Sequence, residues 1–276
     1  MDTTYLTSRF GRNAVGTRSD RPLTNDEIAE VAPSIFTLSA HESRSERYTY
    51  IPTSDVLDGL RKEGFQPFMA CQTRVRANDK RAHTKHLVRL RHADQIPGRE
   101  ANEIILLNSH GSSSYQMLAG MFRFVCQNGM VCGDTVDDIR VPHKGDVIGQ
   151  VIEGAFRVLD SFEAATHQRE KMAGLALTDG EQTAFARAAL ALRYDDDKPA
   201  PITEQQLLTS HRMEDRAPDL WMTLNRVQEN MLNGGLRGRN ANGRATTTRA
   251  VTGIDQNIRL NRALWVLADE LCRLRA

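Results

Sequence analysis

The spacing of apolar residues changes once along this chain, close to Gly145. Between residues 66 and 142, apolar and polar residues alternate in several short runs, which is the two-residue period of β-strands. Beyond Gly145, apolar residues recur at intervals of three and four, which is the period of an amphipathic helix. Strands followed by helices predict an α+β fold, with an antiparallel sheet in the N-terminal half, a long amphipathic helix covering it, and a helical C-terminal half.

Capping residues and helix breakers set the expected bounds of these elements. A short helix is predicted to begin at Thr24 or Asn25 and to end before Pro33, and a second helix is predicted at 54–63. The predicted strands are 48–51, 66–76, 84–92, 103–109, 114–126, 130–132 and 138–142. The predicted later helices are 146–173, 179–193, 202–211, 217–232 and 255–274.

Three parts of the chain are expected. Residues 1–24 contain several arginines and no apolar period, which predicts a flexible basic arm. Residues 25–145 are expected to form the sheet-rich half of the core, and residues 146–276 the helical half. Within the helical half, residues 233–253 are rich in Gly, Asn, Thr and Arg without periodicity, so a flexible basic loop is expected there.

Composition narrows the class of protein. With 276 residues, of which 40% are hydrophobic and 26% charged, the chain can bury a core without disulfides or a structural metal. Four cysteines without a Cys-x-x-Cys pair are typical of a reducing compartment. The longest apolar run of the first half, 104–107, is far shorter than a membrane span, and the N-terminal residues lack the apolar core of a signal peptide. We therefore expect a cytoplasmic protein without membrane contact.

The charge is nearly balanced, but the basic residues are unusual in kind and position. Only six of the 36 basic residues are Lys, and the other 30 are Arg. Arginine binds phosphate in bidentate fashion and stacks on bases, although a GC-rich coding sequence would also enrich it. Between Arg74 and Arg99, eight basic residues accompany two acidic ones, a local balance of +6 in a chain whose total is +1. Four more arginines lie between Glu229 and Asp255 with no acid among them.

Alternation along two predicted strands places many of these cations on one surface. Lys85, Arg89 and Arg91 share a face of 84–92, and Arg74 and Arg76 share a face of 66–76. Paired as a hairpin, the two strands would present a basic face to a phosphate backbone. A merely solvated face of an antiparallel sheet is the alternative explanation. The predicted nucleic-acid-binding residues are Arg74, Arg76, Lys80, Arg81, Lys85, Arg89, Arg91, Arg123, Arg237, Arg239, Arg244 and Arg249.

Other polar groups give weaker signals for chemistry. The histidines within 83–92 lack the spacing of a zinc site. Residues 108–114, with His110 among several hydroxyls, favour a turn, and residues 195–197 favour a solvated acidic loop. A Cys126–His110 pair stays open as a nucleophile with its base. No phosphate-binding or nucleophile motif occurs, so we predict no catalytic residue, no metal and no cofactor.

The run from 103 to 134 resembles the signature of the family called domain of unknown function 932, proteins carried by prophages, plasmids and other mobile elements. The resemblance covers about residues 50–230 and rests on two motifs in order. The residues that carry it are Asn108, Ser109, His110 and Gly111, followed by Phe122, Arg123, Val125, Cys126, Asn128 and Gly129. This resemblance implies phage or plasmid biology, and with it DNA replication, recombination or evasion of host defence.

A basic sheet followed by a long helix is also similar to the core of the Rad52-like single-strand annealing proteins. That resemblance implies a ring or filament of identical subunits that holds single-stranded DNA in a basic groove. Annealing requires no bond-making residue, because the protein neutralises phosphate charge while the bases stay available for pairing. We therefore expect a single-stranded DNA-binding and annealing protein that acts in homologous recombination without nucleotide hydrolysis.

Two alternatives belong to other classes of function. The first is a nuclease-like enzyme that acts on nucleic acid, which would use His110 with nearby carboxylates. The second is a phage or plasmid inhibitor of a host defence system, which would require a large acidic or apolar interaction surface. The basic bias favours nucleic acid over such a surface.

Overall fold

The computed structural model describes residues 14–37, 52–73, 82–93, 100–108, 114–123, 128–133, 138–194 and 199–275. The chain divides into two compact units. The sheet unit comprises residues 1–130, 135–162 and 252–254, and the helical unit comprises residues 131–134, 163–251 and 255–276. Within the described ranges, no helix combines the length and the apolar character that crossing a membrane would require.

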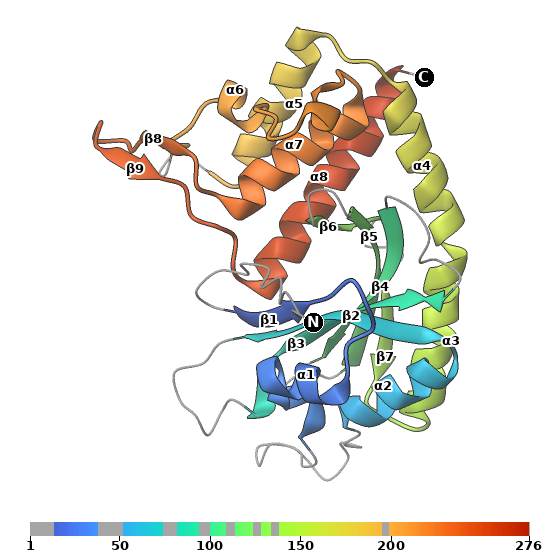
Figure 1. Cartoon of the computed structure of the whole chain (residues 1–276). Helices are drawn as coiled ribbons and strands as arrows, with labels where there is room; N and C mark the ends of the chain where they lie inside the picture. The colour runs from blue at the N-terminus through green and yellow to red at the C-terminus, as the bar shows by residue number, and fades with distance from the viewer. Residues whose placement is uncertain are drawn as a thin grey trace. The chain divides into compact units, whose positions relative to one another are not determined.

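One antiparallel sheet of seven strands organises the sheet unit (Figure 1). The strands follow the order β1-β2-β3-β4-β5-β6, and β7 pairs with β5 beside this path. Consecutive strands therefore lie next to one another, as expected for a meander built from hairpins. Their bounds are β1 Ala14–Arg18, β2 Phe65–Thr73, β3 His86–His92, β4 Glu100–Asn108, β5 Ser114–Arg123, β6 Asn128–Val131 and β7 Ile139–Pro142.

Two helices pack beside each other on this sheet, as Figure 1 shows. Helix α2 contacts β2 and helix α3, and α3 contacts β5 and β7. The approach of α2 to α3 is close because Gly59 has no side chain, and a Cβ at this position would lie 3.0 Å from Ile148. The bounds of the helical elements are α1 Asn25–Val31, the 3₁₀ turn η1 Pro33–Phe36, α2 Thr53–Lys62 and α3 Val147–Asp160.

The helical unit is built around α7 and α8. Trp221 of α7 and Trp265 of α8 meet edge to face with ring centroids 6.3 Å apart, and both side chains are buried. A buried amide pair, Gln228 and Asn261, joins the same helices at 2.6 Å. The bounds are α4 Phe162–Gly174, α5 Asp179–Ala191, α6 Glu204–Leu207, the 3₁₀ turn η5 Met213–Arg216, α7 Leu220–Asn233, β8 Arg237–Arg239, β9 Ala245–Thr247 and α8 Ile254–Arg275.

The α+β fold class is confirmed, and four local predictions are wrong. Residues 14–18 form β1 instead of part of a flexible arm, because their backbone pairs with β2 from Ala14↔Thr73 to Arg18↔Met69. The helix expected at 146–173 is interrupted at Ser161, whose hydroxyl bonds to the carbonyl of Val158. The other two corrections are that 202–211 contains only the short α6 and that 233–253 contains a hairpin. The strand predicted at 48–51 lies outside the described residues.

Candidate nucleic-acid interface

Two of the strand arginines that were predicted to face solvent, Arg89 and Arg91, are buried. Arg89 and Arg91 alternate on β3 and share one face of the sheet, as predicted. Their side chains are only 2% and 1% exposed. Glu103, on the neighbouring strand β4, is 0% exposed. The prediction of an exposed basic sheet face is therefore wrong for Arg89 and Arg91.

Glu103 is the shared carboxylate partner of both arginines, through three hydrogen bonds. Arg89 Nη1 donates to Glu103 Oε2 at 3.0 Å, and Arg91 donates from Nε and Nη2 to Oε1 at 3.0 and 2.9 Å. Arg89 also donates to the carbonyls of Met130 at 3.3 Å and Gly129 at 3.2 Å. A Cβ on Gly129 would lie 2.6 Å from the guanidinium carbon of Arg89. The glycine of the second family motif thus makes room for this arginine.

The charges of this cluster perturb one another strongly. Burial alone would raise the pKa of Glu103, but the charges of Arg89, Arg91 and Arg18 outweigh burial and lower it. Burial lowers the pKa of Arg18 to about 10, and the two β3 arginines add to that effect. Glu103 is therefore ionised at neutral pH, and the cluster holds buried charge that is already partnered within the sheet.

Two other predicted residues of the sheet unit, Arg123 and Lys85, are described and add little exposed charge. Arg123 is also buried, and its Nε lies 3.7 Å from a carboxylate oxygen of Glu100. Lys85 is half-buried just before β3. The remaining candidates, Arg74, Arg76, Lys80 and Arg81, lie outside the described residues.

The basic segment of the helical unit is an ordered hairpin. Strands β8 and β9 pair antiparallel with Arg237 opposite Thr247 and Arg239 opposite Ala245. Gly243, with a φ of +72°, and the Asn240 side chain, which accepts from the backbone nitrogens of Asn242 and Arg244 at 3.0 Å each, close its turn. The expectation of a segment without regular structure is therefore wrong.

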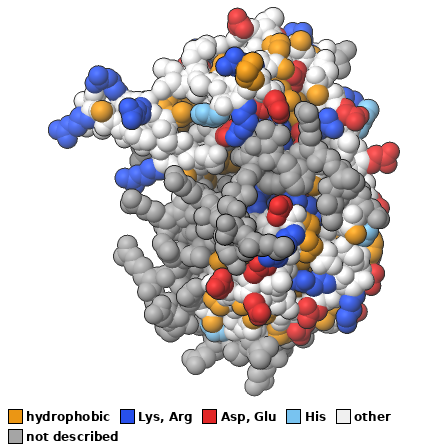
Figure 2. Space-filling view, in the orientation of Figure 1, with side chains coloured by type: hydrophobic (Ala, Val, Ile, Leu, Met, Phe, Trp, Pro, Cys, Tyr) orange, Lys and Arg blue, Asp and Glu red, His pale blue; other side chains and the backbone are white. Residues whose placement is uncertain are grey.

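All four arginines of this segment are exposed: Arg237, Arg239, Arg244 and Arg249. Basic side chains gather on the hairpin in Figure 2, with no acidic side chain beside them in that view. Arg239 donates to the carbonyl of Gly243 at 2.8 Å. Across the described ranges, none of the four forms an ion pair with a carboxylate. Their charge is therefore available to a ligand.

The hairpin is anchored by its backbone, so its position does not depend on the arginine side chains. The backbone nitrogen of Arg239 donates to the carbonyl of Pro201 at 2.9 Å. Gln206 of α6 donates to the carbonyl of Arg237 at 2.7 Å. Gly238 permits this approach, because a Cβ at that position would lie 1.8 Å from the Pro201 oxygen. We refer to residues 237–249 as the arginine hairpin.

A second group of polar residues that the sequence did not reveal is centred on the hydroxyl of Thr53. This hydroxyl lies 2.9 Å from His86 Nε2 and 3.1 Å from the Tyr115 hydroxyl, and it accepts from Asn108 at 3.0 Å. Asn108 also bonds to His143 at 3.1 Å. All five side chains are buried, and they join four separate elements of the sheet unit. Asn108, the first residue of the motif 108–111, therefore has a structural role, because it hydrogen-bonds to Thr53 and His143 inside the sheet unit.

The weaker chemical candidates have the following outcomes. His110 and Cys126 lie outside the described residues, as do 195–197. His86 belongs to the Thr53 network, and His92 packs edge to face on Phe65 with centroids 5.0 Å apart. Over the portion of the chain that the structure covers, no group of three His, Cys, Asp or Glu residues has the arrangement of a metal site.

Comparison with known proteins identifies the family. The model of a family described as "Domain of unknown function (DUF932)" matches residues 40–265. The chain belongs to the DUF932 family. It is similar to two proteins of Escherichia coli strain K12, the UPF0380 protein YfjQ, at 57% identity, and the UPF0380 protein YafZ, at 56%. Each match spans 270 residues and covers 97% of this chain and 98% of the relative. No solved structure matches the chain.

Proposed function

We propose that this DUF932 protein binds single-stranded nucleic acid through the arginine hairpin and promotes the annealing of complementary strands. The observation that carries the proposal is the exposure of four arginines on a hairpin held by backbone hydrogen bonds, with no carboxylate partner among the described residues. Arg89 and Arg91 have no part in it, because Glu103 already binds both. The proposed binding surface is thus the second of the two basic stretches that the sequence predicted.

Arginine suits this ligand for two reasons. Its guanidinium binds phosphate oxygens with two parallel hydrogen bonds, and its planar face stacks on bases. Stacking requires bases that are free of a duplex, which favours a single strand over double-stranded DNA. Arg237 and Arg239 are two positions apart on β8, so both lie on one face of the hairpin and can contact successive parts of one strand.

Annealing and self-assembly extend the proposal beyond binding. A protein that neutralises phosphates while leaving bases accessible lowers the repulsion between complementary strands. A ring or filament of identical subunits, which the resemblance of the sequence to Rad52-like proteins implies, is part of this proposal. Light scattering with and without oligonucleotide tests assembly, and the rate of pairing between two labelled complementary strands tests annealing.

The direct test is the salt dependence of oligonucleotide binding. Replacing Arg237, Arg239 and Arg244 together by Gln removes three cations. The slope of log affinity against log salt for a labelled single strand should fall by about 2, at about 0.7 per lost phosphate contact. A triple variant of Arg187, Arg216 and Arg273 to Gln is the matched control, because it removes the same charge from exposed positions of the same unit.

The two triple variants distinguish binding by the hairpin arginines from attraction by the overall charge of the protein. The hairpin variant alone should lose affinity, and a duplex of the same length should bind the wild-type protein less tightly. Equal losses in the two triple variants would assign binding to overall charge. Absence of binding by the wild-type protein at low salt would refute the proposal.

A further inference from the structure

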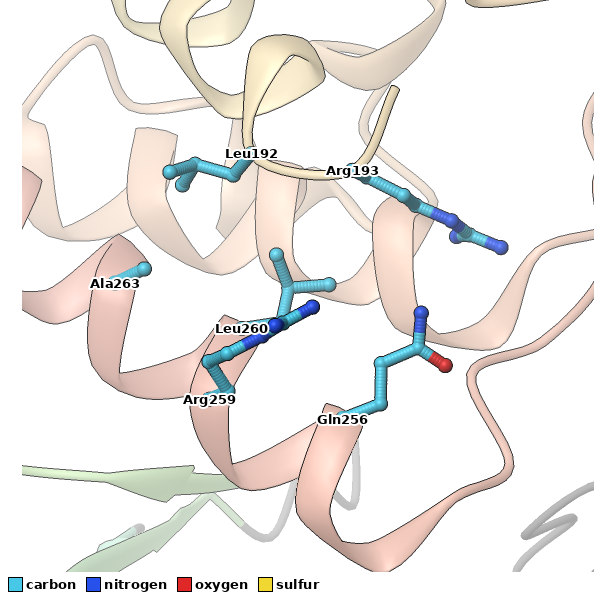
Figure 3. Close-up of a pocket in the computed structure, with 6 residues that line it drawn as sticks. All are labelled: Leu192, Arg193, Gln256, Arg259, Leu260 and Ala263. Carbon is cyan, nitrogen blue, oxygen red and sulfur yellow. The ribbon is translucent and has the colours of Figure 1, made fainter. Parts of the chain in front are cut away.

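A small pocket opens in the helical unit between the end of α5 and the first turns of α8 (Figure 3). Its volume is about 250 Å³. This size is just below the range of about 300–1,000 Å³ that is typical of small-molecule sites, so the pocket can take one base or one phosphate group. Its lining residues are Leu192, Arg193, Gln256, Arg259, Leu260 and Ala263.

The lining combines an apolar surface with a basic rim. Leu192, Leu260 and Ala263 supply the apolar part, and Leu192 is 41% exposed although it is a large hydrophobic residue. Arg259 is exposed, and among the residues described here it pairs with no carboxylate. An apolar surface beside a guanidinium that lacks a partner matches a nucleotide, which has a flat base next to a phosphate.

Arg193 connects this pocket to the arginine hairpin. In Figure 3 its side chain extends from the end of α5 on the side of the pocket opposite α8. Its guanidinium donates to the carbonyl of Met231, at the end of α7, and to the carbonyl of Arg249, where the hairpin returns. Because each terminal nitrogen of Arg193 donates to a backbone carbonyl, this residue positions the pocket wall against the hairpin, and Arg259 is the rim cation that has no carboxylate partner among the described residues.

We infer that this pocket binds one nucleotide of the strand that the arginine hairpin holds. The base lies on Leu192 and Leu260, the phosphate pairs with Arg259, and the amide of Gln256 contacts the edge of the base. The inference rests on the proposed function and adds to it a second contact point. Hairpin and pocket belong to the same compact unit, and Arg193 of the pocket wall donates to the carbonyl of Arg249 at the end of the hairpin, so the two lie next to each other.

The experiment uses two probes with the full-length protein: the mononucleotide dTMP, followed by ligand-observed NMR, and a labelled thymidine 20-mer, followed by anisotropy. The variants are Arg259→Ala and, as a control on the same helix, Arg273→Ala. Arg273 is exposed and forms only a surface pair with Asp269 and Glu270, so its loss changes net charge equally and costs little stability.

We expect dTMP to bind the wild-type protein and the hairpin triple variant alike, and to be lost in Arg259→Ala. The 20-mer should bind Arg259→Ala about tenfold more weakly, with a salt slope lower by about 0.7, whereas Arg273→Ala should bind like the wild type. Absence of dTMP binding to the wild type, or equal behaviour of the two single variants, would overturn the inference.

The two proposals fail separately. If the 20-mer depends on the hairpin but dTMP does not bind, the pocket inference is wrong and the hairpin proposal stands. If dTMP binds through Arg259 while the hairpin variant keeps full affinity for the 20-mer, the hairpin proposal is wrong and the pocket is a nucleotide site in its own right.

Discussion

Two groups of arginines in this protein lie on β-strands with the same alternation, yet they have opposite environments. Arg89 and Arg91 of β3 are 2% and 1% exposed and share the carboxylate of Glu103. Arg237 and Arg239 of β8 are exposed and pair with no carboxylate in the described part of the chain. The difference arises from the neighbouring strand, because β4 presents Glu103 to β3, whereas β9 presents Thr and Ala to β8.

This comparison shows why local net charge does not identify a binding surface. A buried arginine is tolerated only where an anion and further acceptors replace its hydration. An exposed arginine keeps its hydration until a ligand displaces it, so its charge acts on partners outside the chain. Arg89 and Arg91, from the most basic stretch of the sequence, thus belong to the interior of the sheet unit, whereas the four arginines of 237–249 are exposed.

The largest effect is expected for Glu103→Gln. This change leaves Arg89 and Arg91 buried without their counter-charge, and breaking a buried pair in this way costs about 3–5 kcal/mol of the free energy of unfolding. Urea denaturation followed by circular dichroism measures the loss. A loss below about 1 kcal/mol would mean that these arginines are hydrated in solution and that the two groups are alike.

Gly238→Ala should disturb the hairpin without touching its charges. The added Cβ would lie 1.8 Å from the Pro201 oxygen, so the strand must move and give up its bond to Pro201. The expected cost is about 1–3 kcal/mol, again by urea denaturation, together with weaker oligonucleotide binding. Gly180→Ala is the control, because the nearest atom to its Cβ is 4.0 Å away. Equal stability of the two variants would show that the hairpin is not held at Pro201.

Acid should remove the contribution of Glu103 to stability. The pKa of Glu103 is lowered in the folded protein from its ordinary value of 4.5, so the unfolded chain takes up the proton more readily. The stabilisation is therefore complete above about pH 4.5 and is lost as the pH falls through the lower folded value. The stability difference between the wild type and Glu103→Gln, measured by urea titration from pH 7 downward, should shrink in that range. A difference independent of pH would contradict an ionised Glu103.

The smallest effect on stability is expected from the hairpin itself. Replacing Arg237, Arg239 and Arg244 together by Gln should change the free energy of unfolding by less than about 0.5 kcal/mol at each position, because exposed side chains contribute little, and the bond from Arg239 to the Gly243 carbonyl is exposed too. Urea denaturation followed by circular dichroism measures this change in the free energy of unfolding. A loss as large as that of Glu103→Gln would mean that these arginines serve folding.

The fold was largely predictable from local signals. Alternation located β2 to β5, the Thr24 cap located α1, and the pairing of β2 with β3 was expected. The failures lie where a long-range partner decides the structure. Residues 14–18 form a strand only because β2 provides an edge, and the hairpin forms where the backbone meets Pro201. Neither partner is close in sequence.

The site was predictable only in part. The arginines of 237–249 were identified by the absence of acids around them, and all four are exposed in the structure, while their role in binding stays a prediction. The burial of Arg89 could not be read from β3 alone, because it depends on Glu103 in another strand. The available signal for this burial was Glu103, the acid that immediately precedes the apolar run 104–107. The Thr53 network gave no signal, since its residues come from α2, β3, β4, β5 and the position after β7, five segments that are separate in the sequence.

The most direct test of the comparison is arginine footprinting with phenylglyoxal in the presence and absence of a single-stranded oligonucleotide, read by peptide mass spectrometry. We predict that Arg237, Arg239 and Arg244 react in the free protein and are protected by the oligonucleotide, while Arg89 and Arg91 do not react in either state. Unchanged reactivity of the hairpin arginines on binding, or protection confined to the sheet unit, would contradict the account.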